Sequence, residues 1–323
     1  MFKSGFIAIV GRPNAGKSTL LNALLDQEIS IVTPKAQTTR DQVLGILTQP
    51  DRGQIVFVDT PGVHRAKQGG INEAMMDQVR TALEAPEVIW YVMDPASKLE
   101  HEAAVIDLLA KAEAPVLVLM NKIDRTEVAE GTKAGKKASF LLPSARVEEL
   151  EASVREALQN KGVEVLGWKR ISALTRDGVA ELLDHAWALL PEGLAFFPDP
   201  DQVSDRPVRF FVAEKIREQL LKLLGDEVPY SCAVEIEKFD EHSKPIRIEA
   251  NIHVERESQK GIVIGEGAKK IKEIGQAARF EIEKFLGSQI FLGLKVKLLK
   301  DWSRDPEALS RMGYFLPKKE RVK

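Results

Sequence analysis

The chain has 323 residues, of which 44% are apolar, so two units with separate cores are predicted. No run approaches the roughly 20 apolar residues of a membrane span, and the early run at residues 6–10 is too short for a signal peptide. The single cysteine, Cys232, excludes an internal disulfide and fits a reducing compartment. We therefore expect a cytoplasmic protein.

The net charge of −2 conceals a difference between the two parts of the chain. Residues 205–323 hold 24 Lys and Arg against 20 Asp and Glu, whereas residues 1–204 hold 22 against 28. Residues 260–300 contain nine basic and four acidic side chains, a balance that suits a bound polyanion and an ordinary solvated helix face about equally.

Short apolar runs alternate with helical patterns through the first part of the chain. Turn-bounded apolar runs predict buried parallel strands at residues 6–10, 55–58, 88–93 and 116–120, and a further strand is predicted at residues 165–171. Helical spacing is found at residues 17–25, 71–83 and 100–111. The alternation predicts a mostly parallel, doubly wound α/β domain over residues 1–190, with ligand loops at the strand carboxyl ends. Residues 125–162 are interpreted as an inserted loop and helix without an assigned function.

Residues 11–18 read GRPNAGKS, which matches GxxxxGK[ST] between a predicted strand and a predicted helix. Such a loop turns backbone N–H groups toward phosphates, while Lys17 neutralises the β- and γ-phosphates and Ser18 binds Mg²⁺. Chance produces the pattern in about 1% of chains of this length. The expected phosphate-binding residues are Asn14, Ala15, Gly16, Lys17, Ser18 and Thr19.

Two further loops are expected to complete the phosphate and metal site. Asp59 begins the DTPG sequence at a strand end, where it can hold Mg²⁺ through water while the Gly62 N–H faces the γ-phosphate. In the QTTRD sequence of residues 37–41 we choose Thr39 over Thr38 as the hydroxyl that closes over Mg²⁺. The predicted metal ligands are therefore Ser18, Thr39 and Asp59, and the predicted catalytic residues are Lys17, Thr39 and Gly62.

The NKID sequence at residues 121–124 indicates which base is bound. The Asp124 carboxylate can accept hydrogen bonds from guanine N1–H and the N2 amino group, a donor pair that adenine lacks. Asn121 and Lys122 belong to the same predicted site, with a plain turn as the alternative. Ser172, Ala173 and Leu174 are expected to complete the base pocket through a backbone N–H.

The second part of the chain has a different order of elements. A proline-containing stretch predicts a linker at residues 191–207. Residues 208–303 then read α-β-β-α-α-β, and residues 304–323 form a tail. Five of these elements are given ranges: a helix at 208–224, strands at 231–239 and 246–255, a helical pattern at 268–285 and a strand at 290–299.

Taken together, GRPNAGKS, QTTR, DTPG, NKID and SAL resemble the TRAFAC class of P-loop GTPases. The second part narrows the resemblance to the Era family through LPE at 190–192, SDRP at 204–207, IRE at 216–218, PY at 229–230 and RMGY at 311–314. The likeness spans nearly the whole chain. It implies a slow GTPase that uses GTP, GDP and Mg²⁺, with a type II KH domain that binds single-stranded RNA near the 3′ end of small-subunit (16S) ribosomal RNA and assists 30S assembly. It also implies a monomer that binds no DNA and makes peripheral contact with the inner face of the cell membrane.

The resemblance places the KH loop, normally GxxG, at Gly265, Glu266, Gly267 and Ala268. Ala268 replaces the second glycine, and its methyl group disfavours positive φ, so we expect weaker RNA contact at this turn. The expected RNA-binding residues are Lys260, Gly265, Glu266, Gly267, Ala268, Lys269, Lys270 and Lys272.

Val63 follows Gly62, where Ras-like enzymes carry a glutamine that orients water. Resemblance to GTPases with an apolar residue there implies that Asn14 helps to bind K⁺ beside the phosphates. His64 as a general base is an alternative, although a lone loop histidine is more often simply polar. Two other functions stay open: an RNA-binding protein whose GTPase half is a passive scaffold, and a P-loop kinase.

Overall fold

A computed structural model describes residues 1–35, 37–63, 69–126, 141–225 and 227–316. Two compact units can be distinguished. The first comprises Met1–Ser30, Thr39–Arg65 and Gln78–Asp205, and the second comprises Ile31–Thr38, Ala66–Asp77 and Arg206–Lys323. His64, residues 127–140 of the predicted insertion and residues 317–323 of the predicted tail lie outside the described residues.

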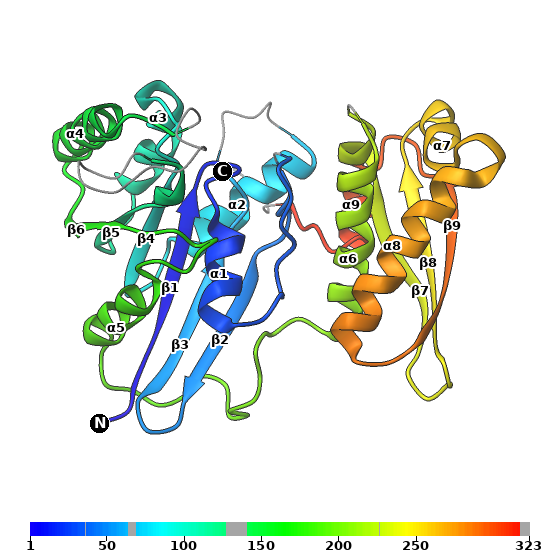
Figure 1. The fold of residues 1–323 in the computed structure, drawn as a ribbon, viewed down its shortest axis with the longest axis horizontal. Helices are drawn as coiled ribbons and strands as arrows, with labels where there is room; N and C mark the ends of the chain where they lie inside the picture. Colours follow the sequence, from blue (N-terminus) through cyan, green and yellow to red (C-terminus); the bar gives the residue numbers. More distant parts are fainter. Residues whose placement is uncertain (36, 64–68, 127–140, 226, 317–323) are drawn as a thin grey trace, which may run out of the picture. The chain divides into compact units, whose positions relative to one another are not determined.

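Strands and helices alternate through the first part of the chain, as predicted, except that an additional strand, β2, joins β3 directly (Figure 1). The strands are β1 (Lys3–Gly11), β2 (Val43–Gln49), β3 (Gly53–Asp59), β4 (Val88–Met93), β5 (Val116–Met120) and β6 (Val165–Arg170). The helices are α1 (Lys17–Leu25), α2 (Ile71–Ala82), α3 (Leu99–Leu109), α4 (Ser144–Asn160) and α5 (Val179–Leu189), with a short 3₁₀ turn, η1, at Ile123–Arg125. The predicted α/β fold class is confirmed.

The six strands form one sheet in the order β2-β3-β1-β4-β5-β6. Only β2 runs antiparallel to its neighbour, with Val43 opposite Asp59 and Gln49 opposite Gly53. Along the sheet, the chain passes from β1 toward β3 by way of α1, and it passes from β4 to β5, in the opposite direction, by way of α3. Because crossover connections are right-handed, α1 and α3 lie on opposite faces of the sheet. Strand order therefore reverses beside β1, and the carboxyl end of β1 is where a ligand crevice is expected.

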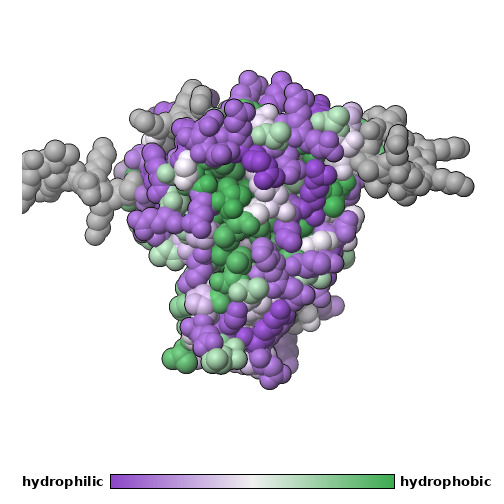
Figure 2. Space-filling view, turned by 90° about the vertical axis from the view of Figure 1, so that its left-hand side faces the viewer, coloured by the Kyte–Doolittle hydropathy of each residue, from purple (hydrophilic) through white to green (hydrophobic). Residues whose placement is uncertain are grey.

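The strand β6 forms one edge of this sheet, and β2 forms the other. The side of the unit that carries β6, α4 and α5 shows an apolar stripe between hydrophilic side chains (Figure 2), and Leu166 of β6 is exposed. The exposed Lys169 and Arg170 end the same strand, and charges on an edge discourage pairing with another chain. None of the described helices is both long and apolar enough to cross a bilayer.

The second unit contains the predicted α-β-β-α-α-β order. Its elements are α6 (Val208–Leu223), η3 (Val228–Ser231), β7 (Ala233–Asp240), β8 (Ile246–Val254), α7 (Glu257–Ile264), η4 (Glu266–Ala268), α8 (Lys269–Leu286), β9 (Ile290–Leu298) and α9 (Pro306–Arg311). The sheet order is β7-β8-β9, antiparallel and then parallel. Val212, Ile252 and Ile274 belong to the core that joins the helices to the sheet, and burying such side chains contributes about 1.5–3 kcal/mol each.

The segment after β9 packs within the second unit. Trp302 is fully buried, and its indole N–H donates to the Ser231 carbonyl at 2.9 Å. Tyr314 is also buried, with its ring centroid 6.3 Å from that of Trp302. The described part of the predicted tail therefore begins with an ordered helix, α9, capped by the Asp305 side chain.

Candidate nucleotide site and RNA groove

The loop between β1 and α1 lies at the carboxyl end of β1 and is held by unusual backbone angles. Gly16, which precedes the first turn of α1, has φ 98°, and Asn14 has φ 63°. A Cβ atom on Gly16 would lie 2.2 Å from Asn121 Nδ2, and one on Gly62 would lie 2.6 Å from the Pro13 nitrogen. Both glycines are therefore required where the loops approach each other most closely.

Lys17 is buried in this loop. Its Nζ donates to the carbonyls of Gly11 and Arg12, each at 3.1 Å. Burial lowers the pKa of Lys17 to about 8, although the carboxylates of Asp59 and Glu102 oppose the change. A desolvated ammonium group inside a glycine loop is suited to bind phosphate oxygens, because an anion replaces the solvation that burial removes.

Three oxygen-bearing side chains meet beside Lys17. Ser18 Oγ lies 2.7 Å from Asp59 Oδ2 and 2.8 Å from Thr39 Oγ1. By contrast, the Thr38 hydroxyl donates to the Lys35 carbonyl and contacts Thr33, so the geometry favours Thr39 over Thr38 as the metal ligand.

Asp59 tests whether this cluster suits a divalent cation. The residue is fully buried, and its Oδ1 has no hydrogen-bond partner among the residues that the structure describes. Burial raises the pKa of Asp59, while Lys17 opposes this shift. A buried carboxylate that keeps one oxygen without a partner among the described residues, together with the Ser18 and Thr39 hydroxyls, offers the oxygen ligands that Mg²⁺ prefers. Ser18, Thr39 and Asp59 therefore fit the predicted metal.

The NKID segment ties the predicted base pocket to the phosphate loop. Asn121 Nδ2 donates to the Ala15 carbonyl at 2.8 Å, and its Oδ1 accepts from the Ala173 N–H at 2.9 Å. Asp124 Oδ1 accepts from Ser172 Oγ at 2.6 Å. One side chain, Asn121, thus connects three loops, and a hydroxyl orients the carboxylate of Asp124.

The first two residues of the SAL segment make backbone contacts within the protein. The Ser172 N–H donates to the Asp177 carbonyl and the Ala173 N–H to Asn121, so both are engaged within the protein. Leu174 is 75% exposed. The contacts of this segment therefore position Asp124 and Asn121. Thr19, the remaining predicted phosphate residue, is half-buried in the first turn of α1.

Asp94 is a residue of this site that the motifs do not include. Its Oδ2 lies 2.6 Å from Lys122 Nζ, and Lys122 also donates to the Asn14 carbonyl. Asp94 directly follows β4, at the same edge of the sheet as the phosphate loop. A carboxylate at the end of a central parallel strand is the signal that would have identified it.

Three residues of the KH loop have positive φ, including Ala268, whose side chain disfavours that conformation. Gly265, Gly267 and Ala268 have φ of 72°, 56° and 60°. The methyl group of Ala268 therefore does not prevent the positive φ, although a left-handed L-residue costs roughly 1–2 kcal/mol.

We expect Ala268→Gly to raise the free energy of unfolding by about 0.5–1 kcal/mol, because glycine adopts this φ without strain. Urea denaturation of the two proteins measures the difference. The matched control is Ala277→Gly within α8, which lies in regular helix and should lower stability by about 1 kcal/mol. Equal losses in both variants would contradict the strain at residue 268.

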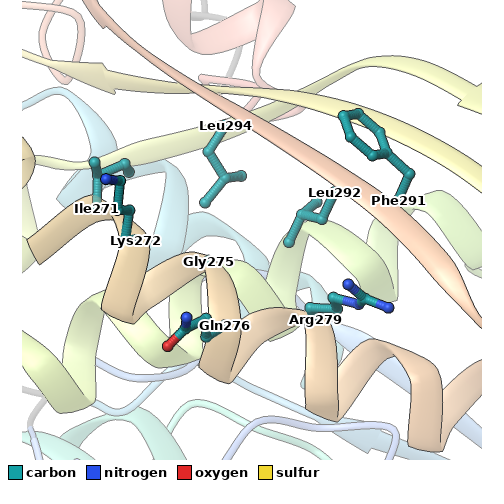
Figure 3. Close-up of a pocket in the computed structure, with 8 residues that line it drawn as sticks. All are labelled: Ile271, Lys272, Gly275, Gln276, Arg279, Phe291, Leu292 and Leu294. Atoms are coloured by element: carbon teal, nitrogen blue, oxygen red, sulfur yellow. The ribbon is translucent and has the colours of Figure 1, made fainter. Parts of the chain in front are cut away.

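A groove lies beside this loop, between α8 and β9 (Figure 3). Its volume is about 360 Å³, and it is lined by Ile271, Lys272, Gly275, Gln276, Arg279, Phe291, Leu292 and Leu294. Leu292 and Leu294 point from β9 toward α8, while Lys272 and Arg279 belong to the helix side. Of the predicted RNA-binding residues, only Lys272 lines this groove; Lys260 and Lys270 pair with Glu257 and Glu273. An apolar floor with basic side chains suits unpaired bases and their phosphates.

The fold and the two sites define the class of protein: a P-loop GTPase joined to a KH domain. Residues 6–122 match the family described as 50S ribosome-binding GTPase, and residues 227–303 match the KH domain family. The chain belongs to the GTPase Era family, which confirms the predicted resemblance.

Relatives of nearly equal length support this assignment. GTPase Era of Carboxydothermus hydrogenoformans is 40% identical over 316 residues, covering 97% of this chain and 98% of the relative. GTPase Era of Geobacter metallireducens is 42% identical, with the same coverage. A crystal structure of Era in complex with MgGDPNP and nucleotides 1506–1542 of 16S ribosomal RNA has a TM-score of 0.85 at 36% identity, covering 98% of this chain and all of that one.

Proposed function

We propose that this protein binds and hydrolyses GTP, binds the 3′ region of small-subunit ribosomal RNA through its KH domain, and assists assembly of the 30S subunit. The observation that carries the proposal is the contact network of Asn121, which joins the phosphate loop to the segment that orients Asp124. A phosphate site and a guanine-selective carboxylate held in one network constitute a guanine nucleotide pocket.

The chain's own residues have distinct tasks in GTP hydrolysis. The N–H groups of residues 14–19 and the ammonium of Lys17 hold the β- and γ-phosphates, and Asp124 selects guanine with Asn121 and Lys122 in support. Ser18, Thr39 and Asp59 would hold Mg²⁺, which would supply charge neutralisation at the transferring phosphoryl group. The Gly62 N–H would face the γ-phosphate. Val63 is buried and carries no polar group, so catalysis here rests on charge and positioning.

The finer catalytic proposal is slow turnover that K⁺ stimulates. Asn14 stands in the left-handed region at the rim of the phosphate loop, where its side chain can bind a monovalent cation beside the phosphates.

We expect phosphate release from GTP to be faster in K⁺ than in Na⁺ by about tenfold or more, equivalent to about 1.4 kcal/mol of barrier, and to be lost in Lys17→Ala. A malachite-green assay measures this, with Asn14→Gly as a variant that keeps the φ of 63° and loses the amide. Equal rates in both salts would remove the K⁺ proposal. Turnover that survives Lys17→Ala would favour a passive scaffold, and ATP competing equally with GTP would favour a P-loop kinase.

The RNA proposal places single-stranded RNA along the KH loop and the groove between α8 and β9. The proposed contacts are Lys260, Gly265, Glu266, Gly267, Ala268, Lys269, Lys270 and Lys272, to which the groove adds Arg279. Support comes from the Era relative solved with a 16S ribosomal RNA fragment and from the basic side chains beside an apolar floor.

GTP binding is proposed to change RNA affinity through residues 37–41. Thr39 belongs to the metal cluster, whereas the neighbouring Thr38 lies in the second unit, where its carbonyl accepts a hydrogen bond from Arg217 of α6. A loop ordered by the γ-phosphate would therefore act on a residue bonded to the KH helix.

We expect the affinity for a 3′-end 16S oligonucleotide to differ at least several-fold, about 1 kcal/mol, between GDP and a GTP analogue at fixed salt. Filter binding measures it. Arg279→Ala should weaken RNA binding without changing GTP turnover, whereas Lys238→Ala on β7, the opposite edge of the sheet, should change neither. Identical affinities in every nucleotide state would end the switch proposal, and an unaffected Arg279→Ala would end the groove assignment.

The remaining proposals concern partners and location. We propose that the protein works in the cytoplasm, as a monomer that binds the 30S subunit and no DNA. Peripheral contact with the inner face of the cell membrane is part of the same proposal and is tested by flotation with anionic vesicles.

A further inference from the structure

A hydroxyl group outside the motifs contacts the predicted metal ligand Asp59. Ser30 lies in the loop between α1 and β2, is 5% exposed, and donates from Oγ to Asp59 Oδ2 at 3.2 Å. The same carboxylate oxygen also accepts from Ser18 Oγ at 2.7 Å. Two hydroxyls therefore occupy Oδ2, while Oδ1 has no partner among the described residues.

Ser30 is held in place by a side chain of α1. Asn22 Nδ2 donates to the Ser30 carbonyl at 2.7 Å, and Asn22 Oδ1 accepts from the Ser30 N–H at 2.9 Å. This pair of bonds fixes the backbone of Ser30 at both of its polar groups. Asn22 is four residues after Ser18, so the two side chains project from the same face of α1.

Two side chains on one face of α1, Ser18 and Asn22, thus contribute to the contacts of Asp59. Ser18 contacts the carboxylate directly, and Asn22 reaches it through Ser30. The two hydroxyls bond the same oxygen from residues 18 and 30, which restrains rotation of the carboxylate about its Cβ–Cγ bond. A carboxylate fixed in this way presents a defined oxygen, Oδ1, to a cation and its waters.

We propose that Asn22 and Ser30 form a positioning pair that orients Asp59 for Mg²⁺. The inference rests on the proposed nucleotide function and adds two residues to the Mg²⁺ side of the site. Outer hydrogen-bond partners of metal ligands typically change metal affinity by about 10–100-fold when they are removed. Ser30 is a positioning residue, because it contacts Asp59 and is not itself assigned to the metal.

The test is the Mg²⁺ dependence of the release of a fluorescent GDP analogue, measured over a Mg²⁺ titration and in EDTA. We expect Ser30→Ala to raise the Mg²⁺ concentration for half-maximal slowing of release by about tenfold. The release rate in EDTA should stay within about twofold of the wild type, because the phosphate loop and base pocket are unchanged. A purely structural role for Ser30 would instead accelerate release equally in both conditions.

Two further variants complete the design. Thr33→Ala removes a hydroxyl of the same loop that contacts Thr38 and not Asp59, so its Mg²⁺ dependence should match the wild type. Asn22→Ala releases Ser30 without removing the hydroxyl and should raise the Mg²⁺ requirement by about three- to tenfold, which keeps the test valid if Ser30→Ala does not fold.

The outcomes separate this inference from the proposed function. If Mg²⁺ slows release in the wild type but the titrations of Ser30→Ala and Asn22→Ala are unshifted, the positioning pair is wrong and the nucleotide site stands. If the wild type binds no guanine nucleotide, or Mg²⁺ has no effect on its release, the proposed function itself fails.

Discussion

Asp124→Asn should lower GTP affinity by about 10³-fold and create affinity for xanthosine triphosphate. The carboxylate is proposed to accept two hydrogen bonds from guanine, each worth about 1.5–3 kcal/mol for a charged acceptor, so losing them removes roughly 4 kcal/mol. Xanthine replaces the N2 amino group with an oxygen, which the amide N–H of asparagine can bind. Ser172 Oγ, which lies 2.6 Å from Asp124 Oδ1, can still donate to the amide oxygen.

Competition of GTP and xanthosine triphosphate against a fluorescent GDP analogue measures this exchange of specificity. Asp184→Asn is the matched control, since it removes the same charge from an exposed residue of α5 that pairs with Arg52. Its nucleotide preference should equal that of the wild type. Retained GTP selectivity in Asp124→Asn would show that the base lies elsewhere.

Gly16→Ala should reduce the affinity for GDP and GTP by about 10³-fold. Its Cβ would lie 2.2 Å from Asn121 Nδ2, and this amide cannot withdraw without breaking its bonds to the Ala15 carbonyl and the Ala173 N–H. Two hydrogen bonds at about 1–1.5 kcal/mol each, together with roughly 1–2 kcal/mol for a left-handed alanine, approach 4 kcal/mol.

Gly162→Ala separates the steric effect from backbone strain. Gly162 also has positive φ, at 71°, but nothing lies within 4 Å of an added Cβ. We expect this control to lose about 1 kcal/mol of stability and no nucleotide affinity. Isothermal titration with GDP and thermal denaturation provide both measurements. Nucleotide binding by Gly16→Ala at wild-type affinity would contradict the close approach of the two loops.

The sequence predicts most of this fold because its signals are local. Glycine loops, strands of four to six apolar residues and helical spacing each depend on neighbours in the chain, and the predicted α/β class and the α-β-β-α-α-β order follow from them. The cluster of Ser18, Thr39 and Asp59 is also anticipated, because each residue belongs to a short motif next to a strand or helix end.

Contacts between distant segments were not predictable from these patterns. Asp94 reaches Lys122 only because β4 and β5 are neighbours in the sheet, and Ser30 is separated from Asp59 in the chain by the strands β2 and β3. The groove combines α8 with β9, so Arg279 carried no signal of its own in the sequence. The engagement of the Ala173 N–H by Asn121 likewise depends on where two loops meet.

The register of the β2–β3 hairpin sets the position of Thr39 relative to Ser18 and Asp59. Seven opposed pairs run from Gln49 and Gly53 at the turn to Val43 and Asp59 at the other end, and Thr39 stands four residues before Val43. Slippage by two residues would carry Thr39 about 7 Å along the strand, far beyond the 2.8 Å that joins it to Ser18. The length of the turn between β2 and β3 thus determines whether the Thr39 hydroxyl reaches Ser18, and insertions there should weaken the proposed response of residues 37–41 to GTP.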